Sequence, residues 1–177
     1  MPSNLTDVKV DIILPNYNSA PYLEETINSV KNQTFKNWKL IIVDANSNDQ
    51  TQKILKKYIS HKKINVIFLK KKKKAGFCRN FALLKSKSDY VAFIDSDDIW
   101  KKEKLSKQLY FMIKNKYHFT YTNYLPFKAD IKKKSLKEIK PKKFFNFEMF
   151  IKNTSIATSS MVIKRSLIGN TKFTNTK

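Results

Sequence analysis

Up to residue 115, the chain alternates between two hydrophobic spacings, one typical of strands and one typical of helices. Apolar residues fill every second position from Val8 to Leu14, which predicts a strand that Pro15 ends. From Pro21 onward they recur with helical spacing, which predicts a helix. The same pattern predicts strands at 38–43, 64–69 and 90–94, and helices around 54–59, at 77–84 and at 101–115.

Strands that begin roughly every 25 residues, each followed by a helix, are typical of right-handed βαβ units and a parallel sheet. The segments 41–43 and 91–94 are continuously apolar, which suits burial on both faces of such a sheet. The sequence therefore predicts an α/β fold with a mostly parallel sheet flanked by helices.

The pattern loosens after Tyr117. The sequence predicts a short strand at 118–124, a lysine-rich connection at 126–143, an aromatic-rich helix at 144–151 and a late strand at 156–163. No linker interrupts the chain, so residues 1–177 are predicted to form a single domain.

Composition raises the question of a polyanionic partner. The 177 residues include 36 Lys and Arg against 14 Asp and Glu, a net charge of +22, and the 41% hydrophobic content supports a folded core. Such a charge suits nucleic acid or an anionic membrane. Only Arg79 and Arg165 are arginines, however, and arginine is the residue that binds phosphate bidentately. A solvated lysine-rich surface is therefore favoured over a nucleic-acid-binding module, and no specific nucleic-acid partner is expected.

Cysteine usage and hydropathy indicate the compartment. Cys78 is the single cysteine, which excludes an internal disulfide framework and favours a reducing compartment. The start of the chain lacks a signal-peptide pattern, and no window approaches the roughly 18 apolar residues of a membrane span. A cytoplasmic protein is expected.

The candidate chemistry lies where the predicted strands end, because ligands of open parallel sheets bind beyond the carboxyl ends of the strands. Asp95, Asp97 and Asp98 directly follow the strand at 90–94, and such neighbouring carboxylates repel one another without a cation. Mg²⁺ or Mn²⁺ accepts these ligands together with phosphate oxygens and water, which favours a metal site. The alternative is a helix N-cap by Asp97 or Asp98.

The loop after the strand at 38–43 carries a second polar cluster. Asp44 is placed to bind a ribose or base, as an acid does at this point of dinucleotide folds. Asp, Asn and Ser are equally ordinary turn formers, and Asp49 suits an N-cap of the next helix. The chain has two glycines and no glycine-rich phosphate loop. A diphosphate must therefore be held by a metal and cationic side chains.

Three segments together carry a family resemblance: VDIILPNYNSAPYL with IIVDANSND, then AGFCRNFAL, then YVAFIDSDDIW. They resemble family 2 glycosyltransferases, which have a GT-A fold, a Rossmann-like and mostly parallel sheet. The resemblance implies a nucleotide-sugar-binding half at 8–115 and the start of an acceptor-side half at 116–177.

The resemblance also implies roles for individual residues. Ala45 departs from the family, because it stands where the VDDxSxD pattern has its second acid, often a contact of the base. The residues implied to bind the nucleotide are Pro15, Tyr17, Asn18, Asp44, Asp49, Arg79, Asn80, Asp95 and Asp97, and those implied to bind the metal are Asp97, Asp95 and Asp98.

The reaction implied by the resemblance moves a sugar from a nucleoside-diphosphate sugar, usually a UDP-sugar, to an acceptor hydroxyl by direct, inverting displacement. Mn²⁺ or Mg²⁺ on the acidic cluster neutralises the departing diphosphate. The setting implied is cell-surface polysaccharide or lipopolysaccharide synthesis, with a sugar or lipid-linked acceptor. No match to the family's ED-type base motif follows residue 115, so the catalytic base is expected beyond Lys177.

A membrane role and one further class of enzyme complete the expectations. Residues 127–150 combine lysines with aromatics, which suits peripheral contact with an anionic membrane on its cytoplasmic face, although a solvated loop beside core aromatics is an equal alternative. A nucleotidyltransferase on a related fold would also bind a nucleotide and a metal. Such an enzyme would carry a glycine-rich loop with a lysine after the first strand, and the segment PNYNSA at this position has neither residue.

Overall fold

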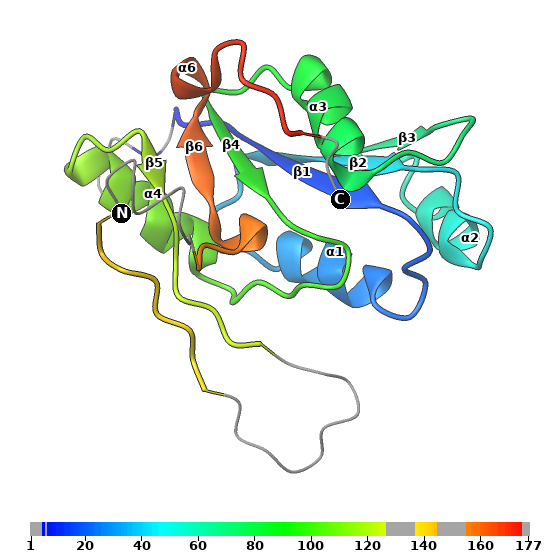
Figure 1. Ribbon diagram of the computed structural model, residues 1–177, viewed down its shortest axis with the longest axis horizontal. Helices are drawn as coiled ribbons and strands as arrows, with labels where there is room; N and C mark the ends of the chain where they lie inside the picture. The colour runs from blue at the N-terminus through cyan, green and yellow to red at the C-terminus, as the bar shows by residue number, and fades with distance from the viewer. Residues whose placement is uncertain (1–4, 6, 127–136, 145–154, 175–177) are drawn as a thin grey trace.

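A six-stranded sheet with the order β3-β2-β1-β4-β6-β5 organises the fold (Figure 1). The computed structural model describes Leu5 and residues 7–126, 137–144 and 155–174. The strands are β1 (Val10–Asn16), β2 (Trp38–Asp44), β3 (Ile64–Phe68), β4 (Tyr90–Phe93), β5 (Phe119–Thr120) and β6 (Val162–Lys164). The helices are α1 (Leu23–Lys31), α2 (Thr51–Lys56), α3 (Ala75–Lys85), α4 (Lys104–Lys114) and α6 (Arg165–Ile168), with a 3₁₀ turn η2 (Thr158–Ser160).

The α/β fold and the mostly parallel sheet predicted from the sequence are confirmed. β1 pairs in parallel with both β2 and β4, and β2 pairs in parallel with β3. Among the described strands only β6 runs in the opposite direction, because it is antiparallel to both of its neighbours, β4 and β5. β5 and β6 are both shorter than predicted. Of the strand predicted at 156–163, only residues 162 and 163 lie in β6, and residues 158–160 form the η2 turn instead.

Pro15 does not end the first strand, which continues to Asn16. The carbonyl of Ile13 accepts a hydrogen bond from Ile94 on the β4 side, and backbone groups of a strand alternate in direction. Pro15, two residues on, therefore turns its nitrogen to the same side, where the pairing of β1 with β4 has already ended at Phe93. The missing N–H of proline costs no sheet hydrogen bond at this position.

Strand residues alternate between two cores, one on each face of the sheet. Ile12 and Leu14 pack with α1, α2 and α4, whereas Ile13 packs with Cys78 and Ala82 of α3. The three helices α1, α2 and α4 thus cover one face, and α3 lies on the other, as Figure 1 shows. This explains the continuously apolar strands, since both faces are covered.

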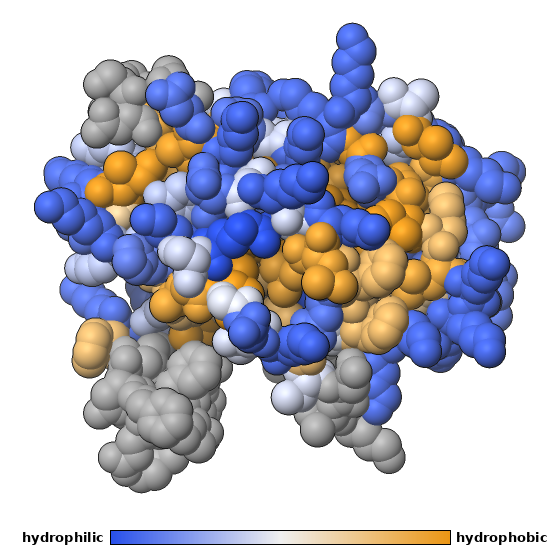
Figure 2. All heavy atoms as spheres, turned by 90° about the horizontal axis from the view of Figure 1, so that it is seen from above, coloured by the Kyte–Doolittle hydropathy of each residue, from blue (hydrophilic) through white to orange (hydrophobic). Residues whose placement is uncertain are grey.

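The α3 face is only partly covered. Figure 2 views this face, where apolar side chains show between the hydrophilic ones. Leu84 of α3 is 80% exposed and Leu167 of α6 is 54% exposed. The segment after α6 returns across this face and ends beside α3 (Figure 1).

Some sequence predictions concern residues outside the described ranges. They include most of the predicted helix at 144–151 and of the basic segment at 127–150. Within the part of the chain that the structure describes, no helix combines the length and apolar character needed to cross a membrane.

Candidate active site

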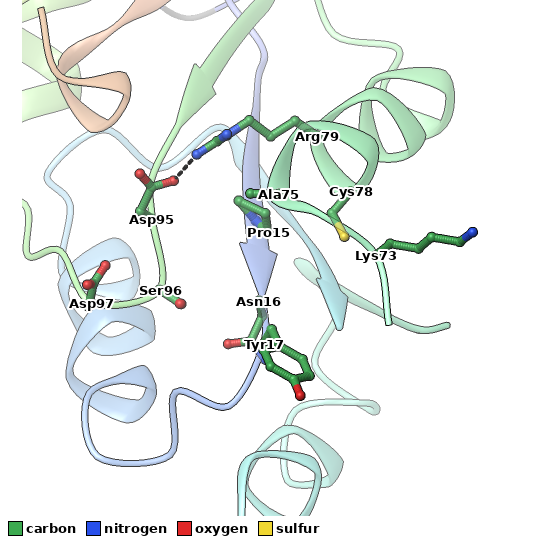
Figure 3. Close-up of a pocket in the computed structure, with 10 residues that line it drawn as sticks. All are labelled: Pro15, Asn16, Tyr17, Lys73, Ala75, Cys78, Arg79, Asp95, Ser96 and Asp97. Atoms are coloured by element: carbon green, nitrogen blue, oxygen red, sulfur yellow. Dashed lines mark hydrogen bonds and ion pairs between the residues drawn. The ribbon is translucent and has the colours of Figure 1, made fainter. Parts of the chain in front are cut away.

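The strand order reverses at β1, which has β2 on one side and β4 on the other. Open α/β sheets bind their ligands at such a switch point. A cavity of about 270 Å³ lies there, at the carboxyl ends of β1 and β4 (Figure 3). Its walls are residues 15–17, residues 95–97, and Lys73, Ala75, Cys78 and Arg79 at the start of α3.

Arg79 and Asp95 point toward each other and pair in the wall of this cavity (Figure 3). Nη2 of Arg79 lies 2.5 Å from Oδ1 of Asp95, and the two side chains are 13% and 35% exposed. The guanidinium carbon also lies 5.4 Å from the ring centroid of Phe173. Nε of Arg79 is buried and has no hydrogen-bond partner in the described ranges. Arg79 is thus a fixed positive charge in the cavity wall, which suits an anionic ligand.

The three carboxylates after β4 have different surroundings. Asp97 is exposed and has no hydrogen-bond or ion-pair partner among the described residues. Asp98 accepts a hydrogen bond from the hydroxyl of Ser159 and does not line the cavity. Burial raises the pKa of the Asp98 carboxyl, the Ser159 hydrogen bond lowers it, and the charges of Asp95 and Asp97 raise it further, so the pKa lies above its ordinary value. The mutual repulsion of these acids is therefore present in the folded chain.

The alternative interpretation of this cluster, as a helix N-cap, is wrong. The next helix, α4, begins only at Lys104, with Glu103 at the N-cap position and no side-chain cap hydrogen bond. Asp97 and Asp98 lie several residues too early to reach the free N–H groups of its first turn.

The donor set of the cavity fits a hard divalent cation. Asp95 and Asp97 both line it, and Mg²⁺ commonly binds one or two protein carboxylates with phosphate oxygens and water. Within Leu5, 7–126, 137–144 and 155–174, no group of three or more His, Cys, Asp or Glu side chains converges on one point. Such a site therefore depends on oxygen ligands from a phosphate.

Asp44 is completely buried and does not line the cavity. Its Oδ1 accepts hydrogen bonds from Nδ2 of Asn16 at 2.7 Å and from Oγ of Ser47 at 2.5 Å, and its Oδ2 accepts one from the Ser47 backbone at 3.1 Å. The amide of Asn16 in turn accepts a hydrogen bond from Ser19. Asp44 thus ties the loop after β2 to the loop after β1.

Asp49 and Asn18 strengthen the same connection from the exposed side. Asp49 accepts hydrogen bonds from the backbone N–H groups of Thr51 at 2.9 Å and Ala20 at 3.2 Å. Desolvation opposes these bonds but does not outweigh them, so the pKa of Asp49 lies below its ordinary value. Asn18, at a positive φ of 48°, exchanges hydrogen bonds with Asn48. The first N–H of α2 therefore donates a hydrogen bond to Asp49, although Gln50 and not Asp49 occupies the N-cap position of this helix.

Among the residues implied by the family resemblance, the structure brings Pro15, Tyr17, Arg79, Asp95 and Asp97 together in the cavity wall. It does not bring the remaining ones there, which are Asn18, Asp44, Asp49, Asn80 and Asp98.

The cavity also uses residues that sequence reasoning missed. Asn16, Lys73, Ser96 and Cys78 line it, and Ser159 lies behind the acidic loop. Asn16 lies within the segment PNYNSA and Ser96 within DSDD, so the sequence could have predicted that both line the cavity. Lys73 belongs to a lysine run that is indistinguishable from a solvated surface, and Figure 3 shows its side chain extending away from the others.

Tyr17 has a basic neighbour at the rim of the cavity. Nζ of Lys72 lies 4.1 Å from the centroid of its ring, a cation–π distance. The positive charge of Lys72 therefore lies next to a residue of the cavity wall.

These features define a class of protein. A family model for glycosyl transferase family 2 matches residues 11–170, and the chain belongs to this family.

Individual relatives agree with this assignment. The chain is 37% identical over 167 residues to TuaG of Bacillus subtilis strain 168, named as a teichuronic acid biosynthesis glycosyltransferase, covering 94% of this chain and 66% of TuaG. It is 34% identical over 172 residues to WfgD of Escherichia coli, named as a UDP-Glc:alpha-D-GlcNAc-diphosphoundecaprenol beta-1,3-glucosyltransferase, covering 96% of this chain and 65% of WfgD.

A solved structure shows the same GT-A fold. S. aureus TarS 1–349 in complex with UDP-GlcNAc is similar with a TM-score of 0.75 and 26% sequence identity, over 92% of this chain and 47% of that one. The chain therefore spans less than two thirds of TuaG and WfgD and about half of the TarS structure.

Proposed function

We propose that this chain binds a UDP-sugar at the carboxyl ends of β1 and β4 and acts in transfer of the sugar to an acceptor hydroxyl, with inversion. The observation that carries the proposal is the pairing of Arg79 with Asp95 in the wall of the switch-point cavity, next to the carboxylate of Asp97, which has no ion-pair partner in the described part of the chain. One fixed cation and two metal-binding acids form a site for a diphosphate. The TarS complex with UDP-GlcNAc supports the choice of nucleotide.

The size of the cavity suits the diphosphate part of the ligand. Its volume of about 270 Å³ lies below the roughly 300–1,000 Å³ of pockets that enclose small ligands. The base and the sugar would therefore extend beyond it, with the base toward the loops held by Asp44 and Asn18. Ala45 is 1% exposed and packs in the core, so base recognition at this position does not use a carboxylate.

The chain's own residues would perform two tasks. Arg79 would hold the diphosphate by charge-assisted hydrogen bonds, using the N–H groups that Asp95 leaves free. Asp97, helped by Asp95, would hold Mg²⁺ or Mn²⁺, which when bound supplies positive charge to the leaving diphosphate. In the displacement, the acceptor oxygen bonds to the anomeric carbon as the bond to the diphosphate oxygen breaks, and a general base takes the acceptor proton.

The setting of the reaction is proposed from the relatives. TuaG is named for teichuronic acid biosynthesis and WfgD for a diphosphoundecaprenol-linked acceptor. By analogy, the acceptor is a sugar or a lipid-linked sugar used in cell-surface polysaccharide synthesis. The chain would then work in the cytoplasm, against the cytoplasmic face of an anionic membrane, which its net charge of +22 favours.

Calorimetric titration with UDP and UDP-sugars, in Mn²⁺ and separately in chelator, tests the proposal. We expect binding that is roughly tenfold or more tighter with Mn²⁺, because the ion neutralises the diphosphate. Asp97→Asn should remove this metal dependence, whereas Asp7→Asn, a change at an exposed acid elsewhere, should keep it. Absence of UDP binding under both conditions would overturn the proposed nucleotide, and equal affinity under both would overturn the metal site.

A further inference from the structure

Ser159 connects the second half of the chain to the acidic loop of the first. Its Oγ accepts a hydrogen bond from the backbone N–H of Asp95 at 2.9 Å and donates one to the carboxylate of Asp98. One hydroxyl thus holds both ends of the Asp95–Asp98 segment. Ser159 itself is 8% exposed, so water does not compete freely for these bonds.

The sheet register explains why Ser159 reaches this place. β6 runs antiparallel to β4, and Val162 pairs with Ala92. Asp95 lies three residues after Ala92, and Ser159 lies three residues before Val162, so the same register brings them opposite each other. If β6 ran parallel to β4, the residues before β6 would lie near the amino end of β4, away from the acidic loop.

The backbone of the η2 turn is fixed independently of this hydroxyl. The indole Nε1 of Trp100 donates a hydrogen bond to the Ser159 carbonyl at 2.9 Å. Nε2 of Gln108 donates one to the Ser160 carbonyl at 3.0 Å. Both donors are buried, since Trp100 is 6% exposed and Gln108 5% exposed. Ser159 is therefore presented to the acidic loop from a rigid support.

We infer that Ser159 is a positioning residue, which sets the acidic loop so that Asp95 and Asp97 can hold a divalent cation against a diphosphate. The inference rests on the proposed function. The turn closed by the Asp98 N–H and the Asp95 carbonyl, 3.1 Å apart, spans Asp97, so fixing the two ends of this turn fixes the carboxylate between them. A free loop would leave the three acids to separate by mutual repulsion.

The test compares Ser159→Ala with Ser160→Ala as a matched control. Ser160 is the buried neighbour, and among the described residues its Oγ bonds only to the carbonyl of Ala157, the residue before the η2 turn. UDP affinity is measured by calorimetry with Mn²⁺ and with chelator for each variant. Ser159→Ala should lower the gain in affinity due to Mn²⁺ by roughly fivefold to tenfold, the loss expected for one or two hydrogen bonds, and leave the affinity in chelator unchanged.

Two further variants keep the test decisive. Ser159→Thr retains the hydroxyl and should keep the gain due to Mn²⁺. Ser159→Cys is nearly isosteric, and because a thiol is a weak donor and acceptor it should lose the gain even if Ser159→Ala does not fold. If wild type shows no gain due to Mn²⁺, the proposed metal site fails. If wild type shows the gain and Ser159→Ala and Ser159→Cys both retain it, only the role of Ser159 is overturned.

Discussion

The side-chain amide of Asn80 makes two hydrogen bonds to the backbone of Phe173, 93 residues further along the chain. Nδ2 of Asn80 donates to the Phe173 carbonyl at 2.9 Å, and Oδ1 accepts from the Phe173 N–H at 2.9 Å. This pairing places the Phe173 ring against Phe93, with centroids 5.2 Å apart, and beneath the guanidinium of Arg79. Asn80 therefore contributes to the cavity through Phe173, although it does not line the cavity itself.

The first prediction concerns this support of Arg79. Phe173→Leu should weaken UDP binding in chelator by roughly threefold to tenfold, because Arg79 loses a cation–π contact in a nearly buried position. Phe173→Tyr keeps the ring and should bind UDP as wild type does. Calorimetry with UDP in chelator measures the effect without any contribution from a metal.

A matched control separates this effect from general loss of stability. Phe111 on α4 is 52% exposed and pairs with Tyr117 on the opposite face of the sheet. Phe111→Leu should leave UDP affinity unchanged. Equal affinities for Phe173→Leu and wild type would show that the ring does not hold Arg79 in a binding position.

The fold could be predicted largely from hydrophobic spacing. Spacing identified all four parallel strands and the helices between them, because both cores need apolar residues at these positions. It misjudged Pro15, since only the shorter length of β4 makes the missing N–H harmless. It also misjudged β6, whose three residues are too few for a periodic signal.

The candidate site was predictable where a motif places its own side chains in the cavity. Arg79, Asp95 and Asp97 are of this kind. In the sequence, Asp44 stands at a strand end just as Asp95 does. Its carboxylate, however, accepts hydrogen bonds from Asn16 and Ser47 and does not line the cavity, which only the tertiary structure reveals. The sequence could not predict the roles of Ser159 and Phe173 either. The antiparallel pairing of β6 with β4 brings Ser159 to the site, and the segment after α6 brings Phe173 there.

A second prediction follows from the difference between the two acids after β2. Asp44→Ala should lower the free energy of unfolding by about 2–3 kcal/mol, since it leaves buried groups of Asn16 and Ser47 without partners. Asp49→Ala, at an exposed position, should cost roughly 1 kcal/mol, typical for loss of a hydrogen bond. Denaturant unfolding measures both. Similar costs for the two variants would contradict the structural role assigned to Asp44.

The third prediction concerns the thiol in the cavity wall. Burial, with a further contribution from the Asp44 charge, raises the pKa of Cys78 to about 11 from its ordinary 9.0. At about pH 8 only roughly a thousandth of the thiol is then ionised, so alkylation should be at least ~100-fold slower than for a free thiol. Mass spectrometry after iodoacetamide treatment measures this rate, and the same protein in denaturant is the control. Rapid alkylation of the folded chain would show that the thiol is accessible.

The last prediction begins at the opposite end of β1, where Asp11 is 3% exposed. Its Oδ2 accepts hydrogen bonds from the Ser86 hydroxyl at 2.7 Å and from the backbone N–H groups of Lys87 at 2.7 Å and Ser88 at 2.9 Å. The side chain of Arg165 also bonds to the Ser86 hydroxyl and to the Ser88 carbonyl. Asp11 thereby secures the loop between α3 and β4, far from the cavity.

Burial alone would raise the pKa of Asp11, but the hydrogen bonds from Ser88, Ser86 and Lys87 outweigh it, so the pKa lies below its ordinary 3.8. A carboxyl with a depressed folded-state pKa stabilises the fold above its unfolded pKa, and this stabilisation is lost as pH falls through the folded value. Asp11→Asn should therefore lower the free energy of unfolding at neutral pH by roughly 1–3 kcal/mol. Its deficit relative to wild type should narrow below about pH 4, where the wild-type carboxyl begins to take up a proton. Denaturant unfolding across this pH range measures the deficit, with Asp7→Asn at an exposed acid as the control. A deficit that stays constant from neutral to acidic pH would show that the charge of Asp11 does not contribute.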